Sequence, residues 1–116
     1  MALSEELQVY RDTYDLLLRV CDLQPKLPRM YRYTVGERLV NQVLDTLSLI
    51  YEVNSEQEKQ SPLARLQRSH QMTVLLLRLL SDRRVLTPQQ FAPYVQLVTR
   101  IGRQITGWKN YYAARK

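Results

Sequence analysis

Apolar residues recur along the chain at alternating steps of three and four, the spacing that places side chains on one face of a helix. The pattern falls into four segments separated by prolines and polar stretches, and it predicts helices over residues 4–24, 35–53, 62–84 and 88–113. In chain order the four stripes are Leu3, Leu7, Tyr10, Tyr14, Leu17 and Cys21; Leu39, Val40, Val43, Leu47 and Ile50; Leu66, His70, Thr73, Leu77 and Leu80; and Phe91, Tyr94, Val98, Ile101, Ile105, Trp108 and Tyr112. Because no segment has the pattern of a strand, we expect an all-α fold.

Residues with helix-capping chemistry stand at the four expected starts, namely Ser4, Thr34, Ser61 and Thr87. Thr34 with Glu37, and Thr87 with Gln90, have the spacing of a capping box. Between the first two helices, residues 24–33 contain two prolines and predict an ordered loop. Short connections between four helices favour a single domain, residues 1–116, folded as an antiparallel up-down four-helix bundle.

Several apolar residues fall off these stripes, namely Leu44, Tyr51, Leu75 and Leu79. A bundle of this size would leave them with apolar surface to cover. We therefore expect a cyclic homo-oligomer. Trp108 should be buried against the stripe of the first helix, near one end of the bundle. Gly102 and Gly107 beside the last stripe mark either a close approach of another backbone or positions without such a constraint.

Charged residues are distributed unevenly between the two halves of the 116-residue chain. Residues 1–58 hold six Lys or Arg and ten Asp or Glu, whereas residues 59–116 hold eleven and one, so a net charge of +6 conceals halves of −4 and +10. One sign concentrated on part of a small domain predicts a face for a polyanion, the alternative being a merely soluble surface. Thirteen of the seventeen cations are arginine, whose planar guanidinium suits phosphate.

The predicted nucleic-acid-binding residues lie on the last two helices and the C-terminus: Arg65, Arg68, Arg78, Arg83, Arg84, Arg100, Arg103, Lys109, Arg115 and Lys116. Tyr111 could stack on an exposed base or be plain surface. A secondary basic loop consists of Lys26, Arg29 and Arg32 with Tyr31 and Tyr33. Its tyrosines either contact nucleic acid or cover the end of the bundle.

The sequence lacks the parts of an enzyme. The one histidine, His70, and the one cysteine, Cys21, both lie on apolar stripes, where we expect them to pack in the core. Asp12, Asp15 and Asp22 are expected on a solvated face rather than at a metal. We find no phosphate-binding loop and no Glu-x-x-His pair. The prediction is a non-enzymatic protein with no cofactor, no metal and no small-molecule substrate.

The chain has no apolar run long enough to span a membrane and no secretory signal at its start. A single cysteine cannot form an internal disulfide, which fits a reducing compartment. We therefore expect a cytoplasmic protein without membrane partners.

Three stretches resemble one family of bacterial and phage four-helix bundles. Leu27-Pro-Arg-Met-Tyr-Arg-Tyr-Thr-Val-Gly-Glu-Arg-Leu39 resembles its segment between the first two helices, Leu86-Thr-Pro-Gln-Gln90 the start of its last helix, and Ile101-Gly-Arg-Gln-Ile-Thr-Gly-Trp108 its closing motif. The family is the Avd group, the accessory variability determinants of diversity-generating retroelements. The likeness runs from about Tyr10 to Lys109.

The resemblance implies a five-membered ring of bundles that binds a reverse transcriptase and its template RNA and supports mutagenic cDNA synthesis without catalysing it. DNA is a second polyanion that such a surface could bind. The matched positions Arg32, Tyr33, Gly36, Arg103 and Trp108 serve either packing or binding. A sister group, the four-helix proteins encoded within ribosomal-RNA intervening sequences, implies the alternative: a structural or interaction role without retroelement chemistry.

Overall fold

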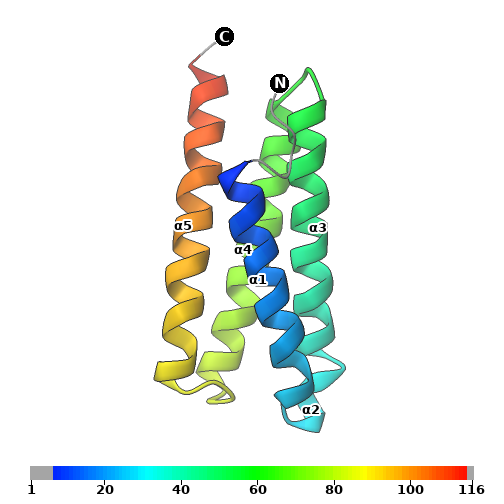
Figure 1. Cartoon of the computed structure of the whole chain (residues 1–116), viewed down its shortest axis with the longest axis vertical. Helices are drawn as coiled ribbons and strands as arrows, with labels where there is room; N and C mark the ends of the chain where they lie inside the picture. Colours follow the sequence, from blue (N-terminus) through cyan, green and yellow to red (C-terminus); the bar gives the residue numbers. More distant parts are fainter. Residues whose placement is uncertain (1–6, 115–116) are drawn as a thin grey trace.

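The computed structural model describes residues 7–114 and consists of four long helices joined by short connections. They are α1 (Gln8–Leu23), α3 (Val35–Ser55), α4 (Gln60–Asp82) and α5 (Pro88–Ala113). The connection after α1 adds a 3-10 turn, η2 (Gln24–Lys26), and one helical turn, α2 (Arg29–Arg32). Neighbours in the bundle follow the order α1, α3, α4, α5 and back to α1, and the long axis measures 47 Å (Figure 1). The expected all-helical bundle is confirmed.

The core contains most of the residues on the four predicted stripes. Leu39, Val43, Leu77, Ile101 and Ile105 are all at most 1% exposed. Two members of the first stripe depart from the prediction, because Cys21 is exposed and Tyr14 is 47% exposed. In α1 the buried face instead passes through Val9, Thr13, Leu16 and Val20, together with Leu17. The predicted stripe was therefore rotated about the helix axis by part of a turn.

Helix starts differ from the expected capping pattern at two places. Thr34 caps no amide, because its hydroxyl donates to the carbonyl oxygen of Met30 in the preceding α2 turn. Ser61 is not the N-cap of α4, which begins at Gln60, because the carboxylate of Glu58 accepts hydrogen bonds from the amides of Gln60 and Ser61. A carboxylate also suits the positive end of the helix dipole. Ser4 lies outside the described residues.

The α4–α5 connection follows its predicted chemistry more closely. The capping box of α5 is present in full, since Gln90 N–H donates to the Thr87 hydroxyl and Thr87 N–H donates to the Gln90 side chain. The α4 helix ends at Asp82, and Arg84 adopts a left-handed conformation with φ of 59°. The amides of Val85 and Leu86 then donate to the carbonyl oxygen of Leu80. This arrangement is a helix C-cap that reverses the chain toward α5.

A polar cluster lies inside the bundle between α3 and α4. The Gln42 amide donates to the Ser69 hydroxyl at 2.9 Å, and the Thr46 and Ser69 hydroxyls are 2.7 Å apart. All three side chains are buried. Buried polar groups are costly unless they are hydrogen-bonded, so this cluster favours the one register of α3 against α4 in which the three side chains meet.

Candidate nucleic-acid interface

The predicted cations of α4 and α5 all lie at the surface within residues 7–114. These are Arg65, Arg68, Arg78, Arg83, Arg84, Arg100, Arg103 and Lys109. Arg115 and Lys116 lie outside the described residues. The two helices pack side by side and run in opposite directions (Figure 1). Between residues 60 and 114 the sequence contains a single acid, Asp82.

Three of these arginines are held in ion pairs. The Arg65 guanidinium pairs with Glu52 of α3 at 2.5 Å, and Arg78 pairs with Asp82 one turn along α4 at 3.6 Å. Both are exposed pairs, which contribute little stability, at most about 1 kcal/mol. Their positive charge is partly compensated, and this reduces their contribution to an anion-binding surface.

Arg100 has a different environment, because it pairs with a buried carboxylate. Its Nε lies 3.1 Å from Oδ2 of Asp12 on α1, and the Gln104 and Gln8 side-chain amides donate to the same carboxylate at 2.7 and 2.9 Å. Burial by itself raises the pKa of Asp12, but the hydrogen bonds from Gln104, Arg100 and Gln8 and the charge of Arg100 outweigh it and leave this pKa below 3.8. The expectation that Asp12 lies on a solvated face was wrong. Arg100 therefore joins α5 to α1.

Arg68 and Arg103 have no hydrogen-bond or ion-pair partner among residues 7–114. Both side chains are exposed; Arg68 follows Gln67 on α4, and Arg103 lies on α5. Lys109 reaches across from α5 and donates to the Gln67 side chain of α4 at 2.9 Å. Within α4 and α5 these three cations have the least compensated charge, and we name Arg68, Arg103 and Lys109 the lateral basic face.

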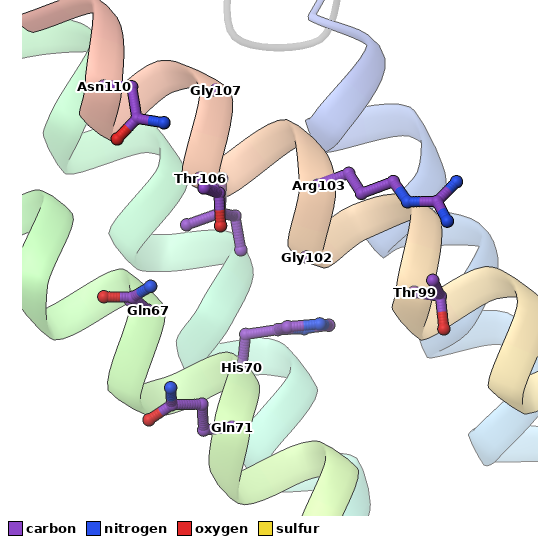
Figure 2. Close-up of a pocket in the computed structure, with 10 residues that line it drawn as sticks. Gln67, His70, Gln71, Thr99, Gly102, Arg103, Thr106, Gly107 and Asn110 are labelled. Atoms are coloured by element: carbon purple, nitrogen blue, oxygen red, sulfur yellow. The ribbon is translucent and has the colours of Figure 1, made fainter.

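A groove of about 550 Å³ lies between α4 and α5, and Arg103 of the lateral basic face lines it. Its polar lining consists of Gln67, His70, Gln71, Thr99, Arg103, Thr106 and Asn110, completed by Ile105 and the two glycines. Figure 2 shows the His70 ring reaching from α4 toward α5, with the glutamines on its own helix. Amide and hydroxyl groups beside arginine are the side chains that contact phosphate and sugar oxygens in nucleic-acid complexes.

The floor of the groove is fixed by His70. Its Nε2 lies 2.8 Å from the carbonyl oxygen of Val98, and the side chain is 6% exposed. Burial lowers the pKa of His70 below 6.5, and the hydrogen bond to Val98 opposes that shift without overcoming it. His70 is a hydrogen-bonded core residue, as expected, and it holds α4 against α5.

The two glycines of the groove differ in their surroundings. A Cβ atom at Gly102 would lie 3.5 Å from Nε2 of His70, which is an ordinary contact distance, and one at Gly107 would meet nothing within 4 Å. No close approach of another helix requires glycine at either position, so the glycines are positions without such a constraint. The absence of two side chains widens the groove.

Aromatic residues near the C-terminal end of α5 make contacts within the bundle. Tyr111 is 51% exposed and stacks edge-on against Tyr112 with ring centroids 5.0 Å apart. Lys59 lies over the Tyr112 ring at 5.7 Å. Trp108 lies beside Leu7 and Val9 at the start of α1, but it is only half-buried, so the expectation that it is buried there was wrong.

The secondary basic loop is an ordered structure. Lys26 and Arg29 are exposed, whereas Arg32 is half-buried and donates to the carbonyl oxygen of Leu27 at 3.2 Å. Tyr31 packs against the core and accepts a hydrogen bond from Nε of Arg83 at 3.2 Å. The structure therefore gives Tyr31 the end-covering role and leaves Tyr33, which is 66% exposed, available for contact.

Sequence reasoning missed the polar groups of the groove. Gln67, Gln71 and Asn110 have no charge and no motif, and their only signal is helical spacing on the flank of an apolar stripe. Within residues 7–114, no cluster of three or more His, Cys, Asp or Glu side chains could hold a metal ion. None of the helices in that range is long and apolar enough to cross a membrane.

One comparison with known proteins gives a match. A family model described as bAvd-like matches residues 7–112, which is nearly the whole chain. No curated protein and no solved structure matches the chain. The matched range includes all four long helices, the groove and the basic loop.

Proposed function

The chain belongs to the bAvd-like family, and on this premise we propose that it is a non-catalytic accessory subunit of a diversity-generating retroelement. In this role it binds RNA and the element's reverse transcriptase in the cytoplasm and supports mutagenic cDNA synthesis. Family membership favours this function over that of an intervening-sequence protein.

The observation that carries nucleic-acid binding is the lateral basic face. Arg68 and Arg103 carry charge that no described residue compensates, and Arg103 lines a groove rich in amides and hydroxyls. A surface of this kind attracts phosphate by charge and discriminates little between bases. This favours a subunit that follows the backbone of a long RNA.

Apolar side chains on α1 and α3 support assembly with further copies. Tyr14 and Leu18 are 47% and 48% exposed on α1, and Leu44 and Tyr51 are 46% and 63% exposed on α3. The helices pack side by side. Apolar area left open on a soluble bundle favours association, and a cyclic ring, five-membered in this family's pattern, would cover one such area on every subunit.

The direct test is reconstitution with the reverse transcriptase and template RNA of the same element. We expect the wild-type protein to co-purify with the polymerase and to be required for cDNA synthesis. The Arg68→Gln, Arg103→Gln double variant should retain its fold and bind RNA more weakly. Full cDNA synthesis in the absence of this protein would contradict the accessory role.

A further inference from the structure

Two basic segments that are far apart in sequence meet at one end of the bundle. Figure 1 shows α2 and the α4–α5 turn at the same end, and the hydrogen bond from Arg83 to the Tyr31 hydroxyl joins them across 52 residues of sequence. We name Lys26, Arg29, Arg83 and Arg84 the basic end. Along α4 it lies about 22 Å from Arg68, at 1.5 Å per residue, so it is separate from the lateral basic face.

The charge of the basic end is largely uncompensated. The side chains of Lys26, Arg29 and Arg84 have no hydrogen-bond or ion-pair partner in the described part of the chain. Of the nearby acids, Asp82 pairs with Arg78, Asp22 lines the same surface notch as Lys26, and Glu37 is exposed in the first turn of α3.

Exposed apolar groups adjoin these cations. Met30 and Tyr33, on either side of Tyr31 and Arg32, are 71% and 66% exposed, the two highest values among large apolar side chains of residues 7–114. The residues that the structure describes leave most of Tyr33 uncovered. An exposed aromatic ring beside arginine and lysine is the arrangement on which unpaired bases stack while the cations hold the backbone.

The segment that carries these groups is fixed before any ligand binds. The Gln24 amide donates to the carbonyl oxygen of Arg32 at 2.9 Å, and the Arg32 guanidinium donates to that of Leu27. Gly36 lets the segment lie close to α3, since a Cβ atom there would be 2.7 Å from Leu27 Cδ1 and 3.2 Å from the carbonyl oxygen of Tyr31. A preformed site does not lose the entropy of ordering its own loop on binding.

We propose that the basic end is a second RNA-contact site that binds unpaired nucleotides, with Tyr33 stacking on a base and Lys26, Arg29 and Arg84 contacting phosphates. The proposal rests on RNA binding by this protein and specifies which part of the RNA the end contacts. A duplex encloses its base faces within the stack, so an exposed tyrosine ring favours single-stranded over paired RNA. The lateral basic face, which offers charge without a free ring, suits either form.

The test compares two RNAs, a blunt hairpin and the same hairpin with a single-stranded 3′ extension, by fluorescence anisotropy with the full-length protein. Tyr33→Ala should weaken binding of the extended RNA by about 5- to 150-fold, the range for loss of one stacked base. Binding of the blunt hairpin should not change. Tyr33→Phe keeps the ring and should restore binding of the extended RNA. Circular dichroism of each variant checks the fold.

Charge at the basic end is tested with matched variants. Arg29→Gln should weaken binding of the extended RNA, whereas Arg11→Gln, which removes an exposed arginine from α1, should not. Arg84→Asn removes the cation while keeping a residue that tolerates φ of 59°, and it should act like Arg29→Gln.

Several outcomes would overturn the proposal. If Tyr33→Ala bound the extended RNA as tightly as wild type, or weakened both RNAs equally, the end would not recognise unpaired nucleotides, although RNA binding by the lateral basic face would stand. If the variant still bound both RNAs but no longer bound the reverse transcriptase, the basic end would be a protein-binding surface. If the wild type bound neither RNA, RNA binding itself would be refuted and this proposal with it.

Discussion

Arg100 and Asp12 join the last helix of the bundle to the first. The Arg100 guanidinium is 57% exposed, but the carboxylate that it contacts at 3.1 Å is only 8% exposed. The arginine therefore neutralises a buried charge, and a change at this position affects the fold as well as the surface potential. Charge reversal at Arg100 would bring a second carboxylate close to Asp12, so this residue is unsuited to a test of nucleic-acid binding.

Removing the Asp12 charge should destabilise the bundle. We expect Asp12→Asn to cost about 1–3 kcal/mol, the usual contribution of hydrogen bonds to a charged group. Because the pKa of Asp12 is lowered from 3.8, the stabilisation is fully present above that pH and is lost as the pH falls through the lower, folded-state value. Urea unfolding of both proteins from neutral to acidic pH should show curves that converge in acid. A gap independent of pH would contradict the ion pair as its cause.

The lateral basic face should determine the salt dependence of RNA binding. The Arg68→Gln, Arg103→Gln variant should reduce the log–log salt slope by about 0.7 for each single-strand phosphate contact that is lost. The change should leave stability within about 0.5 kcal/mol per site, since neither side chain has a partner within the described residues. Filter binding across a salt series gives the slopes. The double variant Arg11→Gln, Arg19→Gln on α1 is the control, and an equal change of slope in it would contradict a localised face.

Assembly should depend on the apolar face of α1 and α3. The wild type should be larger than a monomer by light scattering, and Leu18→Glu with Leu44→Glu should convert it to monomers, because a charge cannot be covered without cost. Val95→Glu, at a comparably exposed position on α5, is the matched control. Dissociation by the control alone would move the interface to α5, and a monomeric wild type would refute assembly.

Protonation of His70 should loosen α4 from α5. Burial lowers its pKa from 6.5, so its contribution to stability is complete above that pH and is lost as the pH falls through the folded-state pKa. His70→Gln should be less stable at neutral pH and should lose this pH dependence. NMR titration of the histidine Cε1–H signal measures the pKa directly, and a value above 6.5 would reverse the predicted direction.

The open groove should tolerate a methyl group. Gly107→Ala should stabilise the protein by up to about 1 kcal/mol, because alanine is the better helix former and the added atom meets nothing within 4 Å. Thermal unfolding of the variant against wild type measures the gain. A loss of stability would mean that the α5 backbone or its surroundings at this position differ from those described here.

The sequence by itself determined the four helices and most of the core, although not the buried face of α1. Apolar spacing, proline positions and the Thr87–Gln90 capping box are local signals, and they placed α5 at its observed bounds. The same local chemistry failed at Thr34 and Ser61, where a preceding helical turn and the Glu58 carboxylate provided the actual partners. Helix capping depends on which hydrogen-bond partner the neighbouring backbone or side chains bring within reach. The spacing of residues in the sequence does not identify that partner.

Charge could be counted from the sequence, but its availability was decided by the tertiary structure. Nothing in the sequence distinguishes Arg100, paired with buried Asp12, from Arg103, three residues later and without a described partner. Nor does it show that the Lys26–Arg32 segment meets Arg83 and Arg84. Ion pairs and shared surfaces join residues that are distant along the chain, so they follow from helix packing. The amino-acid pattern fixes the inward faces of α3, α4 and α5, and the packing decides which cations remain free.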